Sequence, residues 1–403
     1  MNMKWIDGGV TAPNGFRAAG VAAGIKPGST KRDCALVASD GPASVVGVFT
    51  TNLFKAAPVL WCREVCKRAR ARAVFINSGN ANACTGHPGY ANSRVTAKWV
   101  AQGLGASPEE VCVCSTGVIG VPLPMDRIQR GVEGCLAALS ETGSGGAARA
   151  IMTTDTEPKE AALELQLDSG TVRLGAIAKG AGMIAPRMAT MLCIVTTDAA
   201  VDAEPLAGLL RQAAEASFNR ICVDNDMSTN DTLLCLANGR SGVPLLKPGT
   251  EDFARFGEAL TAICRKMAQW LVRDGEGATK FVEIEVSGAA SNSDAKTIAR
   301  SIAFSQLCKT AFFGNDPNWG RIACAAGYAG VPFDPERFDL WVDDVQLVKQ
   351  GQVAEYEETD AAACMKKPEF RIRVCVGDGP GAAAFWTSDL SHDYVTINAD
   401  YRT

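Results

Sequence analysis

Histidine is scarce in this sequence: its 403 residues contain two, His87 and His392. A Ser-His-Asp or Cys-His mechanism would have to use one of them. Both lie in polar stretches, "TGHPGY" and "LSHDY", that are typical of surface or turn positions. If the chain catalyses acyl transfer, we therefore expect its general base to be a group other than imidazole.

The sequence also lacks the cysteine spacing of zinc and redox sites, although it contains fifteen cysteines. The pairs Cys62/Cys66 and Cys112/Cys114 do not form a Cys-x-x-Cys motif, and two histidines offer few imidazole ligands. The number of cysteines is odd, and many of them lie in apolar runs. We expect reduced thiols that pack as small apolar side chains, with neither a metal nor a cofactor.

Three further absences narrow the class of protein. No window approaches 18 uninterrupted apolar residues, which predicts that the chain has no membrane span. The beginning, "MNMKWIDGGVTAPNGF", has no cationic region followed by an apolar core, so no signal peptide is expected. The net charge is −4 and no basic run is longer than "CKRARAR" (66–72), so nucleic acid is not an expected partner. With 47% hydrophobic and 21% charged residues, the composition predicts a soluble, cytoplasmic globular protein.

Short runs rich in β-branched residues alternate with segments of helical periodicity along the whole chain. Expected strands are 34–40, 45–50, 73–77, 111–114, 163–168, 171–180, 191–198, 281–286, 370–378 and 394–398. Expected helices are 92–105, 125–140, 203–218, 253–271 and 294–314. Ser169-Gly170 predicts a hairpin between two of the strands. This mixture predicts an α/β or α+β fold with packed layers.

Thr190 stands where a glycine-rich loop, "KGAGMIAPRMAT", meets an apolar run, and two interpretations of it are open. It is a threonine at the edge of a strand, or it is a nucleophile. An N-terminal threonine supplies its own base, because its α-amine has an ordinary pKa of about 7.7–8.0. Cleavage of the Ala189–Thr190 bond, by attack of the threonine hydroxyl on the preceding carbonyl, would expose that amine. Small neighbours such as Ala189, Gly180 and Gly182 suit this attack.

Other polar stretches are candidates for binding. In "CSTGVIG", Thr116 and Gly117 are expected in a tight turn that either supplies oxyanion donors or is only a turn. Glu276, in "DGEGATKF", is either the partner of a ligand ammonium or a solvated turn residue. The tail "YVTINADYRT" is expected to dock as a strand and to line a pocket. Neither "NSGNANACTGHPG" nor "VDNDMSTNDT" has the spacing of a phosphate loop or a calcium loop.

Several of these stretches, in their order along the chain, resemble the ornithine acetyltransferase family of arginine biosynthesis. That family consists of glutamate N-acetyltransferases, including bifunctional members that are also amino-acid acetyltransferases. The resemblance extends from "GGVTAPNGF" to the last residue. The matching stretches are "STGVIG", "IMTTDT", "KGAGMIAPRMATML", "FNRICVDNDMSTNDT", "DGEGATKF", "FGNDPNWGR" and "YVTINADYRT".

The resemblance implies a layered αββα sandwich of the kind found in self-processing aminopeptidases. It implies self-cleavage between Ala189 and Thr190 into an α chain (1–189) and a β chain (190–403), assembled as α2β2. Thr190 would then take acetyl from N2-acetylornithine and pass it to glutamate in a ping-pong cycle. The resemblance leaves open whether acetyl-CoA is also a donor. Arg187 stands where the family pattern has a small polar residue, so the resemblance does not fix the rate of self-cleavage.

The resemblance also assigns roles to individual residues. Thr116 and Gly117 match oxyanion donors. Positions that match substrate contacts are Lys179, Thr190, Glu276, Asn398, Thr403 and one threonine of "TTDT", with Thr156 preferred to Thr154. From charge alone, we expect Glu276 to bind an ammonium group and Lys179 a carboxylate.

Two other functions fit parts of the pattern. A self-processing aminopeptidase or amidohydrolase with an N-terminal nucleophile would share the cleavage but release acyl groups to water. An uncleaved binding module would use its Gly- and Asn-rich loops for anions.

Overall fold

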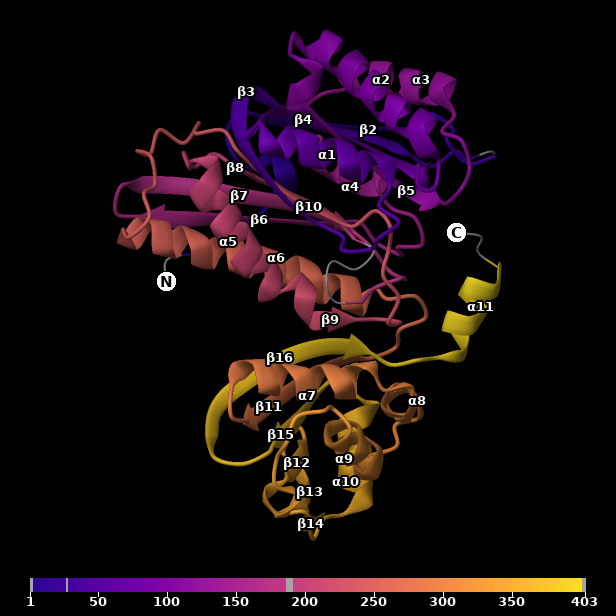
Figure 1. Cartoon of the computed structure of the whole chain (residues 1–403), viewed down its shortest axis with the longest axis vertical. Coiled ribbons are helices and arrows are strands. Elements are labelled where there is room, and N and C mark those ends of the chain that lie inside the picture. Colours follow the sequence, from indigo (N-terminus) through magenta and orange to yellow (C-terminus); the bar gives the residue numbers. More distant parts are fainter. Residues whose placement is uncertain (1–2, 27, 186–190, 401–403) are drawn as a thin grey trace.

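The strands form two sheets in the computed structural model, which describes residues 3–26, 28–185 and 191–400 (Figure 1). The first sheet consists of β1 (Met3–Ile6), β2 (Phe16–Val21), β3 (Cys34–Phe49), β4 (Arg70–Asn80), β5 (Val111–Val118), β6 (Lys159–Leu167), β7 (Gly170–Lys179), β8 (Leu192–Thr197) and β10 (Thr232–Ala237). The second consists of β9 (Ile221–Cys222), β11 (Phe281–Gly288), β12 (Asp339–Val342), β13 (Val345–Lys349), β14 (Gln352–Val353), β15 (Glu369–Cys375) and β16 (Gly379–Ser388).

The first sheet folds over on itself along β3. The first half of this strand pairs with β2 and β4, and its second half pairs with β10. The pairing with β4 shifts in register between Ala38 and Ala43, around Gly41-Pro42. The prediction of two strands, 34–40 and 45–50, is therefore wrong. A proline is tolerated within this continuous strand because the ladder is interrupted there.

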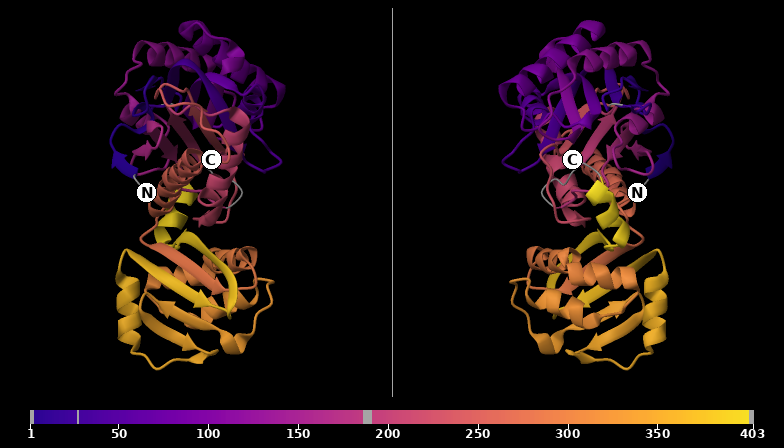
Figure 2. Two further views of the ribbon diagram at one scale, coloured as in Figure 1. Left: turned by 90° about the vertical axis from the view of Figure 1, so that its left-hand side faces the viewer. Right: turned by 90° about the vertical axis from the view of Figure 1, so that its right-hand side faces the viewer.

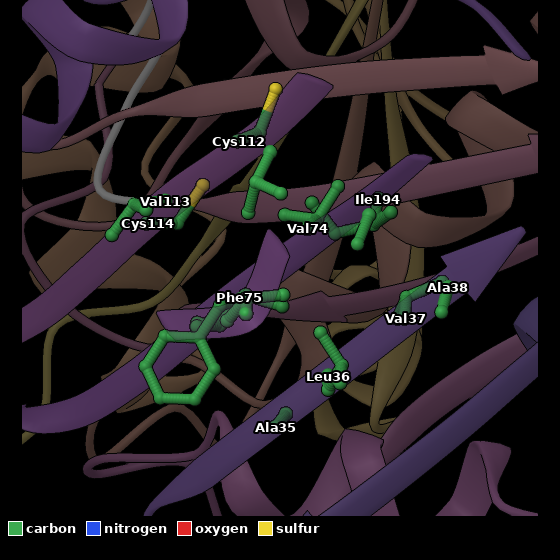
Figure 3. Packing of buried hydrophobic residues seen from close by; sticks show 14 of the residues in the cluster. Ala35, Leu36, Val37, Ala38, Val74, Phe75, Cys112, Val113, Cys114 and Ile194 are labelled. Carbon is green, nitrogen blue, oxygen red and sulfur yellow. The ribbon is translucent and has the colours of Figure 1, made fainter. Parts of the chain in front are cut away.

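The two halves of the first sheet pack face to face, with helices outside each. In β8, Ile194 belongs to the apolar cluster of Val74 and Phe75 (Figure 3). Cys193 and Val195 of the same strand belong instead to a second cluster. Helices α1 (Ala57–Lys67), α2 (Gly86–Leu104) and α3 (Met125–Ala137) cover the half with β5; α5 (Ala203–Glu215) and α6 (Glu251–Arg273) cover the other (Figure 1). The predicted layered αββα sandwich is confirmed.

Helix α6 forms where the apolar stripe of 253–271 predicts it. Thr250 caps its first turn by accepting a hydrogen bond from the Phe253 N–H, and glycines follow its end at Arg273. The predicted β6–β7 hairpin is also confirmed, with Leu167 paired to Gly170.

The single helix expected over 294–314 is two helices, α7 (Asn292–Phe304) and α8 (Gln306–Gly314). Ser305 adopts an extended backbone that ends α7, and its hydroxyl accepts the Cys308 N–H as the cap of α8. Helices that the patterns did not predict are α1, α4 (Ser144–Ala150), α9 (Trp319–Gly327) and α10 (Glu358–Lys366).

The tail is the clearest error in the predicted secondary structure. Residues 394–398 were expected as a strand, but they belong to helix α11 (His392–Asp400). The β-branched run Val395–Thr396–Ile397 suggests a strand, yet within the described residues it joins neither sheet, and Val395 stays exposed. Helical spacing instead brings Tyr394 and Asn398 to one cavity. Figure 2 shows α11 between the two sheet-containing bodies.

Cysteines pack as predicted. Ten of the fifteen are buried, and Cys193, Cys235 and Cys264 lie together in the cluster beneath α6. Burial raises the pKa of the Cys235 thiol to about 12, so it stays neutral in the core. Among the described helices, none is both long and apolar enough to cross a membrane.

Candidate functional site

One cavity of about 110 Å³ collects most of the described residues that the sequence singled out. It lies where the ends of β5 and β7, the loop after α6 and helix α11 meet. The predicted residues that line it are Thr116, Gly117, Thr154, Lys179, Glu276 and Asn398. These positions are up to 282 residues apart in the sequence (116 to 398), so the fold alone brings them together.

Lys179, at the end of β7, is the buried cation of this cavity. Its Nζ donates to Thr153 Oγ1 at 2.8 Å and to Thr116 Oγ1 at 3.4 Å. Burial lowers the pKa of Lys179, and Lys159 lowers it further, while Asp155, Glu276 and Asp231 oppose the shift. Burial prevails, so the pKa of this amine at the cavity wall stays below its ordinary value although three carboxylates favour its charged form.

A buried charge network supports Lys179 from behind. Lys159 Nζ pairs with Asp155 at 2.7 Å and with Asp274, and all three side chains are almost fully buried. Asp155 also accepts the Gly180 N–H at 2.7 Å. Burial alone would raise the pKa of Asp155, but Lys179, Lys159 and the Gly180 N–H outweigh it and hold that pKa below its usual value. The network fixes the backbone on which Lys179 stands.

The threonines of "TTDT" have different surroundings. Thr153 and Thr154 line the cavity, and Thr153 accepts the hydrogen bond from Lys179. Thr156, which the resemblance favours as the substrate contact, donates both its N–H, at 3.1 Å, and its hydroxyl hydrogen to the Asp274 carboxylate. It borders a separate cavity. The structure thus brings Thr154 to the cavity together with Thr153, which the sequence did not single out.

Thr116 and Gly117 lie on a strand rather than in the expected turn. Both belong to β5 and pair with Ser78 and Gly79 of β4; the left-handed turn comes later, at Gly120. A side chain at residue 117 would meet the Gly79 carbonyl carbon at 2.4 Å, and its φ is +129°, so glycine is required. The side chain of Asn230 holds this region by donating to the Ser115 and Ala81 carbonyls, both at 2.7 Å.

Glu276 and Asn398 meet across the opposite side of the cavity. Asn398 Nδ2 donates to Glu276 Oε2 at 2.8 Å, and the Glu276 N–H donates to the Ala181 carbonyl at 2.8 Å. A side chain on Gly182 would collide with the Glu276 carboxylate at 2.3 Å. Glycine at residue 182, in "KGAG", therefore leaves room for the Glu276 carboxylate to pack against the loop that precedes Thr190 in the sequence.

Two acidic residues accept hydrogen bonds from the backbone before and after residues 186–190. Asp224 accepts the N–H groups of Met183 and Ile184 at 2.5 and 2.8 Å, and burial raises its pKa to about 6. Asp231 is fully buried; one oxygen accepts the Met191 N–H at 3.0 Å, and the other has no hydrogen-bond partner among the described residues. Burial raises the pKa of Asp231 well above its usual value.

Some predicted residues lie outside the described residues: the cleavage pair Ala189 and Thr190, and the tail residue Thr403. Sequence reasoning also missed several residues that shape the cavity. For Thr153 and Tyr394 the signal was available, since each lies in a stretch already singled out. Asn230 and Asp231 also lie in a stretch already singled out, "FNRICVDNDMSTNDT", but only the fold shows what their side chains contact. Among the described residues, no group of three or more His, Cys, Asp or Glu side chains could hold a metal ion.

Comparison with known proteins finds relatives that match almost the whole chain. The Arginine biosynthesis bifunctional protein ArgJ of Symbiobacterium thermophilum is 50% identical over 402 residues, 100% of both chains. The protein of that name from Geobacter sulfurreducens is 51% identical over 396 residues, 96% of this chain and 99% of its own. The solved structure of Arginine biosynthesis bifunctional protein argJ from Bacillus halodurans is 40% identical, with a TM-score of 0.50, over 51% of this chain and 97% of its own. The ArgJ family model matches residues 17–403, and the chain belongs to the ArgJ family.

Proposed function

We propose that this protein transfers acetyl from N2-acetylornithine to glutamate in arginine biosynthesis, and that it also acetylates glutamate from acetyl-CoA. The observation that carries the proposal is the convergence of Thr116, Lys179, Glu276 and Asn398 on one cavity. Full-length relatives at about half identity, named bifunctional, support both activities. The substrates are small molecules, as the size of the cavity suits.

The proposed chemistry begins with self-cleavage of Ala189–Thr190. The Thr190 hydroxyl attacks the Ala189 carbonyl, the peptide bond gives way to an ester, and water hydrolyses that ester to free the α-amine of Thr190. The solved chain from Bacillus halodurans is matched over 97% of its length by 51% of this chain, so it is about half as long. A precursor cut near its middle gives chains of that length. We further propose that the products, 1–189 and 190–403, stay together as α2β2.

In the transfer step, the α-amine of Thr190 removes the hydroxyl proton and the oxygen attacks the acetyl carbonyl. Ornithine leaves with that proton, an acetyl-threonine ester remains, and the amine of glutamate then takes the acetyl group. We assign the oxyanion to Thr116 and Gly117, where each donor is expected to contribute about 3 kcal/mol. Lys179 would bind a substrate carboxylate and Glu276 the ammonium of the ornithine side chain; Thr153, Thr154 and Asn398 border the same space.

The unpartnered oxygen of Asp231 suits the proposed terminus. Met191, whose N–H this carboxyl accepts, directly follows Thr190 in the sequence. Cleavage would create an ammonium group next to this residue, and a buried carboxylate with a vacant oxygen is a favourable partner for it. We propose that Asp231 positions the new α-amine of Thr190.

Thr190→Ala tests the cleavage. The variant is expected to migrate as one chain of 42.3 kDa on a denaturing gel, whereas the wild type gives two fragments, and to transfer no acetyl. A wild type that remains a single chain would favour the binding module over the enzyme.

The acceptor separates the transferase from a hydrolase. Release of ornithine from N2-acetylornithine is expected to depend on glutamate, with acetylglutamate formed in equal amount. Release that ignores glutamate would favour the self-processing amidohydrolase. Glu276→Gln is expected to raise KM for N2-acetylornithine roughly tenfold; an unchanged KM would overturn the pairing of Glu276 with the ammonium.

A further inference from the structure

A second cavity, of about 640 Å³, lies next to the site and is lined by cationic side chains. We call it the basic cavity; its cations are Lys26, Lys31, Arg32 and Arg149. It is formed by the loop between β2 and β3, the end of β4 and the segment after α4. Nothing in the proposed transfer from N2-acetylornithine uses these residues.

Three of the four cations of the basic cavity are not neutralised by a carboxylate among the described residues. Lys31, Arg32 and Arg149 are exposed, and within the described residues none of the three forms an ion pair with a carboxylate. Arg149 donates to a backbone carbonyl, that of Gly145, at 2.9 Å. The two carboxylates of the cavity, Asp33 and Asp155, are buried and already engaged.

Asp33 accepts the N–H groups of Ala23 and Ile25, both at 2.6 Å, and so ties down the loop that carries the lysines. Asp155 belongs to the network with Lys159. The surface left open to a ligand is therefore positive, and clustered cations of this kind favour a ligand with several phosphate charges.

The basic cavity and the site cavity share a wall. Thr153 lines both, and its hydroxyl accepts the hydrogen bond from Lys179. Gly79, which lines the basic cavity, pairs in register with the oxyanion residue Gly117. Gly79 has a φ of +96°, and it presents no side chain between the two spaces. A ligand anchored in the basic cavity thus needs to pass Thr153 and Gly79 to reach the reacting position.

We propose that the basic cavity binds the phosphate groups of coenzyme A when acetyl-CoA is the acyl donor, and that the pantetheine arm reaches the site past Thr153. This inference rests on the proposed function. The thioester C–S bond breaks as the C–O bond to Thr190 forms, and the thiol leaves with the proton of the hydroxyl. N2-acetylornithine carries no phosphate, so the cations serve one of the two donors.

The test is the triple variant Lys31→Ala/Arg32→Ala/Arg149→Ala. Its KM for acetyl-CoA is expected to rise on the order of tenfold, since each exposed cation contributes a modest amount. Its kinetics with N2-acetylornithine are expected to stay within about twofold of the wild type. Acetyl-pantetheine, which shares the thioester but lacks the nucleotide, is expected to react equally with both proteins. The control removes three exposed cations that line neither cavity, Arg211, Lys247 and Lys349.

Calorimetry with coenzyme A, adenosine 3′,5′-bisphosphate and inorganic phosphate completes the test. Binding of coenzyme A and the bisphosphate by the wild type, weakened in the triple variant but not in the control, supports the inference. Binding of inorganic phosphate alone would make the cavity a simple anion site and overturn it. An unchanged KM for acetyl-CoA, or an equal loss with both donors, would also overturn it. If the wild type binds coenzyme A through these cations but transfers no acetyl from either donor, the proposed function fails while the binding site stands.

Discussion

The two sheet-containing bodies differ in what they bury. At the site end of the first sheet the interior holds Asp155, Lys159, Lys179, Asp231 and Asp274. The interior beneath the second sheet is mostly apolar, although Lys309 and Asp389 are also buried there, and the ion pairs on its strands are partly exposed. Buried charges stabilise little by themselves, because their desolvation offsets their attraction. Their concentration in one body shows where the fold gives up stability to keep polar groups in place.

The largest effect is expected from a matched pair of buried lysines. Lys159 is surrounded by two carboxylates, whereas Lys309, in α8, donates to neutral acceptors, among them Thr387 Oγ1 at 2.9 Å. Lys159→Met leaves two buried carboxylates without this partner and is expected to lower the free energy of unfolding by about 3–5 kcal/mol. Lys309→Met leaves hydroxyl and carbonyl oxygens and should cost about 1–2 kcal/mol.

Urea unfolding of both variants measures the difference, and circular dichroism confirms that each folds. Acetyl transfer should fall in Lys159→Met and stay near normal in Lys309→Met, since only the first network supports Lys179. Equal losses of stability would show that burial alone, and not the charge of the partners, sets the cost.

A second pair compares two asparagines. Asn230 is buried and satisfies two carbonyls beside the site, while Asn292, at the start of α7, is exposed and accepts the Ala382 N–H at 2.9 Å. Asn230→Ala leaves two buried carbonyls without this hydrogen-bond donor and is expected to lower the free energy of unfolding by about 2–3 kcal/mol. Asn292→Ala should lower it by less than about 1 kcal/mol.

The rate of transfer distinguishes a structural effect from a functional one. Because Asn230 fixes the strand that carries Thr116, its loss is expected to reduce kcat by at least about tenfold under conditions where the variant is fully folded. A normal kcat would mean that Thr116 keeps its place without Asn230.

What the sequence could predict depends on whether an element is determined by its own residues or by partners far away in the sequence. Periodicity locates α6, the β6–β7 hairpin and most core strands, because each depends on its own apolar pattern. It fails for 394–398, where β-branched residues meet no sheet edge, and at Ser305, whose hydroxyl divides one predicted helix. It also misses the continuity of β3 through Gly41-Pro42, which depends on pairing with strands far away in the sequence.

Site residues follow the same division. Thr116, Lys179, Glu276 and Asn398 were found because they match a family pattern, and the fold then placed them at one cavity. Asn230 was not found, since nothing local shows that its amide reaches Ser115 and Ala81. A residue that acts by positioning other residues, as Asn230 does, produces no recognisable motif in the sequence.

Two carboxyl groups predict opposite pH dependences. Burial raises the pKa of Asp224, beside the site, from 3.8 to about 6, whereas the hydrogen bond from Arg273 lowers the pKa of Glu369, on β15. Asp224 therefore adds stability below about pH 4 that is lost as the pH rises through 6. Glu369 adds stability above its unfolded pKa of 4.5 that is lost as the pH falls.

Unfolding of the wild type, Asp224→Asn and Glu369→Gln between pH 3 and 7, roughly the range these groups cover, measures both signs. Asp224→Asn should remove a fall of about 2 kcal/mol between pH 4 and 6, and Glu369→Gln a smaller rise with pH. Parallel curves for all three proteins would contradict the assigned shifts.

The smallest effect is expected where the second body has its ion pairs. Arg371 Nη2 lies 3.2 Å from Glu283, and its Nε lies 3.5 Å from Glu285; half of the arginine side chain is exposed. Arg371→Ala should lower the free energy of unfolding by less than about 1 kcal/mol, and the difference should shrink as salt is added, because solvent ions screen exposed charges. The loss in Lys159→Met should persist at high salt, since ions do not reach that network. A salt-insensitive, large loss in Arg371→Ala would place a buried charge network in the second body as well, and the contrast between the two bodies would no longer hold.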